Sequence, residues 1–358
     1  MMENSTIQTK TTSNLYYNWN DILSKDRMLN FVVGIRGGGK TYGATKLAIS
    51  RYLKQGRKTI WLRRYASELG TEFRTKYFSD MILNNEFPEH ELQVKATDID
   101  GIAKGYIKGK DDKKWEDFIL FMPLSIALKN KSIPFNEYDL IFFDEFLIDT
   151  TKSNLQYLSG WNEPTIFFEF FESVVRTRNN VKCVFIGNAI ATINPYFVEL
   201  NVRFDKDKEW MLSEFTCVHN YKNKEFKEFK QQSTWGRFLS TTRYGAYNMD
   251  NEFINENDDF VEDRPSDSRY VFGIHYMGKN YGVWDDADSG SIYITKQYDK
   301  QQITYAFTTK DMKPNMVVLE NNSYIKQLLK QYFRYGCVRY ADQEIKQMFL
   351  EIIQLMRI

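Results

Sequence analysis

Glycines, one lysine and one threonine are concentrated in residues 34–41, in a pattern that could bind phosphate. The sequence there is Gly-Ile-Arg-Gly-Gly-Gly-Lys-Thr, which fits the Walker A spacing G-x-x-x-x-G-K-[ST]. Glycines let the backbone turn sharply and direct N–H groups at phosphate oxygens, and the dipole of a following helix attracts the same anion. The pattern predicts that ATP binds through Gly34, Ile35, Arg36, Gly37, Gly38, Gly39, Lys40 and Thr41.

Three side chains of this loop have different expected roles. Lys40 would neutralise charge on the β- and γ-phosphates, and the Thr41 hydroxyl would bind Mg²⁺. Arg36 is unusual in a phosphate loop, and it either reaches a phosphate or is a solvated loop side chain. An apolar run at Leu29–Gly34 and helix-forming residues at Thr41–Gln55 favour a phosphate loop over a chance glycine-rich turn.

A second chemically suggestive pattern is the run Phe142-Phe143-Asp144-Glu145. An apolar strand that ends in two acids fits Walker B, where the first acid holds Mg²⁺ and the second polarises the attacking water. Asp144 is therefore the expected metal ligand and Glu145 the expected catalytic carboxylate, although a strand that merely leaves the core can end in the same way. Asn188 ends the next apolar run, where it would sense the γ-phosphate, position water or serve as a turn residue.

Apolar runs that alternate with helix-forming segments surround these motifs. Lys58–Arg64, Tyr138–Asp144 and Val181–Asn188 have the composition of buried strands, and Pro164–Arg176 fits a helix with an aromatic face. The alternation predicts an α/β fold with a mostly parallel sheet. A strand candidate between the two motifs, Thr59–Arg63, favours a P-loop NTPase of the additional-strand, catalytic-glutamate type.

The sequence changes character after about residue 200. Strand candidates at Tyr270–Tyr276, Tyr281–Trp284 and Ser291–Thr295 precede helix candidates at Tyr324–Tyr335 and Asp342–Met356, which predicts a smaller α+β domain. We expect a disordered tail (1–14), a P-loop ATPase domain (15–215), a linker region (216–255) and a C-terminal domain (256–358).

Composition argues against several classes of protein. The net charge is +1, so the chain lacks the strongly basic balance that would itself indicate a nucleic-acid partner. Its 3 cysteines and 3 histidines are too scattered for a disulfide framework or a zinc site. No apolar run reaches the roughly 18 residues of a membrane helix, and the polar start lacks the apolar stretch of a signal peptide. We expect a soluble protein of a reducing compartment with no membrane partner.

Several segments, taken together, resemble the DNA-packaging (encapsidation) ATPases of phi29-like bacteriophages. The matches run in order from about Tyr16 to the C-terminus. The phosphate loop alone would be generic, whereas the whole set is specific. The matching segments are Asp26–Thr41, Leu62–Tyr65, Phe143–Phe146, Arg176–Arg178, Asn188–Tyr196, Trp235–Phe238, Arg243–Gly245 and Met356–Ile358.

The resemblance implies an ATP-driven motor that moves double-stranded DNA into a preformed capsid. Such proteins form a ring, expected to be a pentamer, on the portal (connector) protein of the procapsid in the host bacterial cytoplasm. In the phi29-like group a structural packaging RNA also joins the motor, and the sequence leaves open whether one is needed here. The residues by themselves also permit a nucleotide-gated assembly protein or a helicase-like P-loop ATPase.

The resemblance also suggests cations that act on a neighbouring subunit. Ring ATPases commonly complete each site with an arginine finger from the next subunit. Arg176 matches the family position for this role, and Arg178 is the reserve candidate. Lys131 lies in Pro123–Ser132, which resembles a family segment tied to action in trans. An ordinary solvated cation is the alternative at each position.

Contact with DNA and cleavage of DNA give two further expectations. Lys152 and the stretch Tyr221–Lys230 could contact the DNA backbone, although such cations more often form a solvated surface. Large terminases of other tailed phages carry an RNase H-like nuclease domain, which needs a metal-binding acid on its first strand. Here Gly273 and His275 stand in the Tyr270–Tyr276 strand where that acid is expected. We therefore expect a vestigial RNase H-like domain without nuclease activity.

Overall fold

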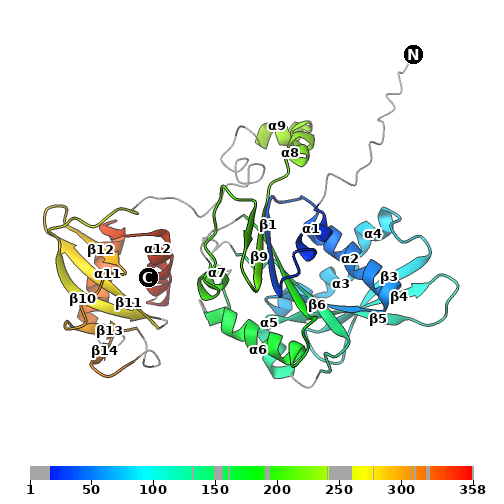
Figure 1. The fold of residues 1–358 in the computed structure, drawn as a ribbon, viewed down its shortest axis with the longest axis horizontal. Helices are drawn as coiled ribbons and strands as arrows, with labels where there is room; N and C mark the ends of the chain where they lie inside the picture. The colour runs from blue at the N-terminus through cyan, green and yellow to red at the C-terminus, as the bar shows by residue number, and fades with distance from the viewer. Residues whose placement is uncertain are drawn as a thin grey trace, which may run out of the picture. The chain divides into compact units, whose positions relative to one another are not determined.

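The computed structural model describes residues 17–130, 133–148, 156–159, 162–189, 194–239, 241, 260–276, 278–307, 309, 312–319 and 323–356. Two compact units divide the chain, one of Met1–Ser159 with Glu163–Asn255 and one of Gly160–Asn162 with Glu256–Ile358. Each unit has its own sheet (Figure 1). Lys131, Lys152, Arg243–Gly245 and the tail expected at residues 1–14 lie outside the described residues.

The first unit is built on one mixed nine-stranded sheet. Its six central strands run parallel to one another, and a hairpin at one edge and a single strand at the other are added antiparallel to them. In order across the sheet, the strands are β3 (His90–Ala96), β4 (Ala103–Gly109), β5 (Glu116–Pro123), β2 (Lys58–Arg63), β6 (Tyr138–Asp144), β7 (Lys182–Asn188), β1 (Leu29–Gly34), β9 (Thr216–Tyr221) and β8 (Trp210–Leu212).

Helices cover both faces of the central strands, which is why those strands are apolar along most of their length. Phe31 and Val33 of β1 pack with the helices of one face, and Val32 between them packs with the helices of the other. Figure 1 shows the two helical layers on either side of the sheet. The first layer contains α5 (Leu124–Ala127), α6 (Glu163–Val175) and α7 (Pro195–Glu199), and the second contains α1 (Trp19–Leu23), α2 (Lys40–Gln55), α3 (Thr71–Lys76) and α4 (Ser79–Leu83).

The expected α/β class with a parallel centre is confirmed, and one boundary differs from the prediction. Residues 216–255 are predicted to form a linker, but β9 pairs with β1 from Leu29↔Thr216 to Gly34↔Tyr221 and is buried at every position. Its sequence, TCVHNY, contains polar residues and gives no strong apolar signal, so only the pairing with β1 reveals it as a sheet strand. Two short helices follow, α8 (Lys224–Gln231) and α9 (Thr234–Leu239).

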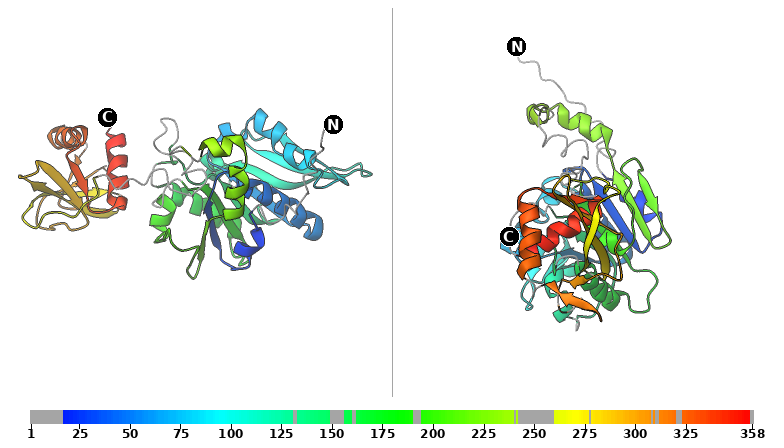
Figure 2. Two further views of the ribbon diagram at one scale, coloured as in Figure 1. Left: turned by 90° about the horizontal axis from the view of Figure 1, so that it is seen from above. Right: turned by 90° about the vertical axis from the view of Figure 1, so that its left-hand side faces the viewer.

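The second unit has a mixed six-stranded sheet. β10, β11 and β12 form an antiparallel meander, and the other three strands run parallel to the strands they pair with. Two helices pack their apolar sides on one face of this sheet (Figure 2). In sheet order the strands are β14 (Met316–Val318), β13 (Thr304–Ala306), β10 (Arg269–Tyr276), β11 (Lys279–Asp286), β12 (Ser291–Thr295) and β15 (Val338–Tyr340), and the helices are α11 (Ser323–Arg334) and α12 (Gln343–Leu355).

The predicted strands and closing helices of this unit are therefore present. Within the described part of the chain, no helix combines the length and the apolar composition that crossing a membrane requires.

Candidate active site

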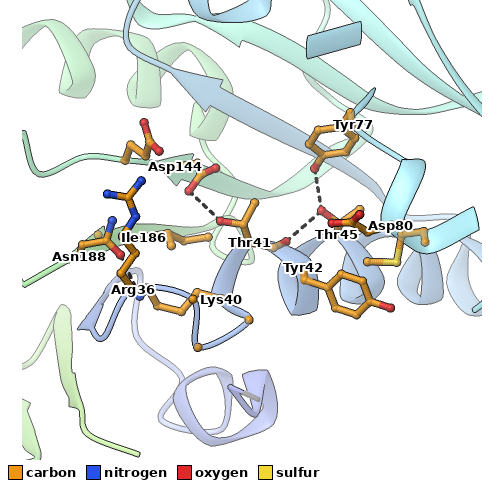
Figure 3. A pocket seen from close by; sticks show the side chains of 16 residues that line it. Arg36, Lys40, Thr41, Tyr42, Thr45, Tyr77, Asp80, Asp144, Ile186 and Asn188 are labelled. Atoms are coloured by element: carbon orange, nitrogen blue, oxygen red, sulfur yellow. Dashed lines mark hydrogen bonds between the residues drawn. The ribbon is translucent and has the colours of Figure 1, made fainter. Parts of the chain in front are cut away.

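The phosphate loop, the two acids and Asn188 meet at one edge of the first sheet. β6, β7 and β1 are neighbouring parallel strands, so Asp144, Asn188 and Gly34 come to the same carboxyl-terminal edge. Side chains there line a cavity of about 370 Å³, a volume typical of ligand sites (Figure 3). The cavity is lined by residues 36–42, Thr45, Tyr77, Asp80, Met81, Asp144, Glu145 and residues 186–188.

The loop adopts a conformation that glycine makes possible. Gly37 and Gly39 have φ values of 84° and 72°, in the left-handed region. Gly34 has no room for a side chain, because a Cβ there would lie 2.6 Å from the carbonyl oxygen of Tyr221 on β9. α2 begins directly after the loop at Lys40, so its free N–H groups and the positive end of its dipole face the cavity.

Lys40 is buried inside the loop that it serves. Its Nζ donates to the carbonyl oxygens of Gly34 and Ile35 at 3.0 and 2.6 Å, and to Oδ1 of Asn188 at 3.3 Å. Burial lowers the pKa of Lys40 to about 7, partly opposed by the negative charge of Asp144. A phosphate anion in the cavity would therefore stabilise the protonated form of Lys40.

Thr41 and Asp144 form a pair of oxygen donors. The Thr41 hydroxyl donates to Oδ1 of Asp144 at 3.3 Å (Figure 3). Burial raises the pKa of Asp144 to about 6, against the opposing charge of Arg63. A hydroxyl and a carboxylate are hard oxygen ligands of the kind that Mg²⁺ prefers, so these residues fit the metal role expected of them.

Glu145 presents an exposed carboxylate from a constrained backbone. Its φ is 58°, a left-handed conformation that costs a non-glycine residue about 1–2 kcal/mol. The side chain is 56% exposed, and Oε2 lies 3.2 Å from Nη1 of Arg63. Adjacent residues thus have different environments, a buried acid at Asp144 and an accessible one at Glu145.

Two arginines at the end of β2 also belong to this site, although no motif in the sequence predicts a role for them. Arg63 lies 3.3 Å from Asp144 as well as contacting Glu145, so one guanidinium bridges both acids. Arg64 is buried and donates to the carbonyl oxygen of Glu145 at 3.0 Å. The sequence signal that could have identified them is a pair of arginines at the end of an apolar strand. Their role follows only from the structure, in which β2 lies next to β6.

The two candidate finger arginines differ sharply in their surroundings. The guanidinium of Arg178 donates to the carbonyl oxygens of Phe135, Asn136 and Tyr138 at 2.9–3.1 Å, which anchors it near the start of β6. Arg176 is exposed just beyond the end of α6. β6 separates this region from Asp144 by roughly 20 Å at about 3.3 Å per residue, so Arg176 does not line the cavity of its own chain.

The chain is similar in sequence to known phage proteins over almost its whole length. The family model of the podovirus DNA encapsidation protein (Gp16) matches residues 11–358. The DNA packaging protein of Bacillus phage phi29 is 34% identical over 347 residues, which cover 96% of this chain and 98% of that protein.

Solved structures give the same result. The bacteriophage phi29 viral genome packaging motor assembly contains a chain that matches at a TM-score of 0.73 and 33% identity, over 96% of this chain and 100% of that chain. The N-terminal domain of the DNA packaging ATPase from bacteriophage phi29 matches at a TM-score of 0.50 and 33% identity, over 59% of this chain and 99% of that domain. With a family model that spans nearly the whole sequence, the chain belongs to the podovirus DNA encapsidation protein (Gp16) family.

Proposed function

We propose that this packaging protein hydrolyses ATP at the cavity and couples the reaction to movement of double-stranded DNA into a preformed capsid. The observation that carries the proposal is the convergence of Lys40, Thr41, Asp144 and Glu145 on one cavity in a chain of the encapsidation family. The similarity to a phage domain that is itself a DNA packaging ATPase supports the same activity here. On this proposal the first unit is a P-loop ATPase domain of the additional-strand type.

The residues around the cavity suit ATP with Mg²⁺. Backbone N–H groups of the loop and of the first turn of α2 would bind phosphate oxygens, and Lys40 would exchange its carbonyl partners for phosphate. Thr41 and Asp144 would hold Mg²⁺, which stabilises the negative charge of the phosphoryl group when bound. The exposed carboxylate of Glu145 would orient the attacking water and accept its proton.

Two further residues of the cavity have roles that follow from their contacts. Asn188 accepts from Lys40 through Oδ1, so this oxygen becomes free to accept from water when Lys40 turns to phosphate, and the amide N–H groups would donate to the γ-phosphate. Arg36 is exposed in the loop that lines the cavity, where its flexible side chain can reach a bound phosphate.

We assign the trans-acting finger to Arg176 and a structural role to Arg178. A finger needs a guanidinium that is free to enter a neighbouring site, and the carbonyl partners of Arg178 occupy its donors. Arg176 is exposed and lies too far from its own cavity to act in cis. The proposal therefore includes a ring, expected to be a pentamer, in which each site is completed by the next subunit.

The second unit fits a vestigial RNase H-like domain that does not cut DNA. Its meander β10–β12 is present, but Gly273 and His275 occupy the strand where a metal-binding acid would stand. His275 is buried, and its Nδ1 lies 2.6 Å from Oδ1 of Asn280. No group of three or more candidate metal ligands occurs among the described residues. Purified protein should leave supercoiled plasmid intact with Mg²⁺ or Mn²⁺, and nicking that acidic substitutions in this unit abolish would contradict the assignment.

The partners of the motor complete the proposal. We expect double-stranded DNA, the capsid portal and other copies of the chain as partners at the procapsid in the host cytoplasm, and a packaging RNA is compatible with the family. A nucleotide-gated assembly protein and a helicase-like ATPase remain the alternatives that the residues permit. Membership of the encapsidation family favours translocation of duplex DNA over both.

Steady-state ATP hydrolysis with and without linear double-stranded DNA tests the proposal. We expect duplex DNA to stimulate hydrolysis by the wild type. Glu145→Gln should lower kcat at least 100-fold at unchanged nucleotide affinity, in line with the roughly 10²–10⁴-fold contribution of a general base. Glu172→Gln is a matched control, because Glu172 is an exposed acid of α6 away from the cavity. Hydrolysis indifferent to duplex DNA, even with portal present, would favour the assembly-protein alternative.

A further inference from the structure

Two successive arginines hold the Asp144–Glu145 turn from opposite sides. Arg63 faces the two carboxylates. Arg64 lies on the other side, because side chains alternate along an extended strand, and it contacts the backbone of the turn. Its Nη1 donates to the carbonyl oxygen of Glu145 at 3.0 Å, and its Nη2 donates to that of Phe146 at 2.7 Å.

Glu163, the first residue of α6, holds Arg64 in this place. Its Oε2 accepts from Nε of Arg64 at 2.7 Å, and its Oε1 accepts from Nη2 at 2.9 Å. The carboxylate also accepts from the Tyr196 hydroxyl at 3.0 Å and from the backbone N–H of Leu158 at 2.7 Å. Arg64 is 3% exposed and Glu163 is 0% exposed, and no polar side-chain atom of either residue lacks a partner.

This arrangement does more than attach α6 to the sheet. A buried ion pair contributes little net stability, because desolvation of both charges offsets their attraction, and apolar side chains could pack the helix equally well. Two nitrogens of Arg64 also donate to the carbonyl groups of Glu145 and Phe146, which belong to the peptide bonds before and after Phe146. Glu145 is the residue there with a left-handed φ of 58°, so the pair acts on the residue whose orientation matters for the attacking water.

We propose that Arg64 and Glu163 are positioning residues that fix the Glu145 carboxylate for reaction and tie it to the first turn of α6. A displacement of α6 moves Glu163, Arg64 and the Glu145 backbone together. Arg176 follows the last turn of the same helix, so contact between Arg176 and a neighbouring subunit reaches Glu145 through α6. The positioning role rests on the proposed hydrolysis by Glu145, and this last consequence rests in addition on the proposed trans role of Arg176.

Kinetics of the full chain test the proposal with Glu163→Gln, Arg64→Lys and Tyr196→Phe. Glu163→Gln and Arg64→Lys should lower kcat at least 10-fold, with KM and the affinity for a non-hydrolysable ATP analogue within 2-fold of wild type. Tyr196→Phe, which removes one hydrogen bond to Glu163, should lower kcat by a smaller factor and is the variant to use if the other two fail to fold. Glu172→Gln, an exposed acid on the same helix, should match the wild type.

A second readout separates positioning from the proposed function. Amide hydrogen exchange of residues 144–148 should be faster in Glu163→Gln than in the wild type or in Glu172→Gln. Wild-type exchange in this segment, or wild-type kcat in Glu163→Gln and Tyr196→Phe with only a lower melting temperature, would overturn the positioning role. Faster exchange in Glu163→Gln, together with a wild type that hydrolyses no ATP, would show that the pair holds the turn and would contradict the proposed function.

Discussion

Lys40 and Asp144 occupy one cavity, and burial shifts both toward their neutral forms. The pKa of Lys40 falls to about 7, and the pKa of Asp144 rises to about 6. Between about pH 6 and pH 7, Asp144 is mostly ionised and Lys40 is mostly protonated. Above about pH 7, Lys40 loses part of its charge. Below about pH 6 Asp144 would take up a proton, and its oxygen could no longer hold Mg²⁺. Both side chains therefore carry the charge that a magnesium nucleotide requires between about pH 6 and pH 7.

Nucleotide binding at pH 7.5 should therefore take up protons. Without a ligand, Lys40 is mostly deprotonated above its pKa of about 7, and the phosphate charge restores its proton. We expect an uptake of roughly 0.5–1 proton per Mg²⁺-nucleotide. Calorimetric titrations in buffers with different ionisation enthalpies measure it. Lys40→Arg, whose guanidinium stays charged, should abolish the uptake, and equal uptake in both proteins would assign the proton to another group.

At the scale of elements, the site depends on how closely β1 and β9 pack. Gly34 ends β1 opposite Tyr221, and the phosphate loop starts at this contact. Tyr221 also lies against Gly38 within the loop. Strand β9, which was predicted to belong to a linker, therefore supports the beginning of the phosphate loop.

Gly34→Ala tests this support. A Cβ at this position would lie 2.6 Å from the backbone oxygen of Tyr221, so β1 and β9 would have to separate. We expect the free energy of unfolding to fall by about 1–3 kcal/mol, with weaker nucleotide binding. Gly70→Ala is the matched control, since its Cβ would have its nearest neighbour at 3.4 Å and the change should stay within about 0.5 kcal/mol. Denaturant titration measures both, and equal stability of the two variants would contradict the close packing.

Arg178 also acts at this scale, as a tie between the end of α6 and the entry to β6. Arg178→Ala would leave several backbone carbonyl groups without their donor, and it should lower the free energy of unfolding by about 1–3 kcal/mol. Arg176→Ala should leave the stability within about 0.5 kcal/mol, because Arg176 is exposed. Thermal and denaturant unfolding compare the two, and a reversed order would exchange their proposed roles.

At the scale of the whole molecule, the proposed ring makes each site depend on two chains. An arginine finger in trans requires a head-to-tail interface, in which one surface of a subunit meets a different surface of the next. The proposed ATP hydrolysis belongs to the first unit, which contains the complete set of cavity residues. The second unit has no group of three or more candidate metal ligands among its described residues.

Mixing two inactive variants tests the trans arrangement. Arg176→Ala keeps an intact cavity without a finger, and Glu145→Gln keeps the finger beside an inactive cavity. In mixed rings, some Arg176→Ala cavities will face the finger of a Glu145→Gln neighbour, so ATP hydrolysis should recover to a measurable fraction of wild type. Each variant alone at the same total concentration is the control. Mixtures that stay inactive, in rings shown to contain both chains, would place Arg176 outside the trans site.

The sequence alone determined the parts of this protein that consist of contiguous residues. The phosphate loop Gly34–Thr41 and the pair Asp144–Glu145 are local patterns, because turn geometry and the end of a strand place their groups. The strands next to them were predicted because burial on both faces requires a nearly continuous apolar run. The family was recognisable for the same reason, as an ordered set of short motifs.

Only the tertiary structure decided which distant residues meet these motifs. Arg63 reaches Asp144 across 81 positions, and Arg64 reaches Glu163 across 99, because β2 lies beside β6 and α6 returns over the same strands. β9 belongs to the sheet through its pairing with β1, although its own sequence is partly polar. The same holds for Arg178, whose partners lie about 40 positions earlier in the chain. Such contacts depend on the order of strands in the sheet, and this order arises from the packing of the whole unit rather than from any segment of it.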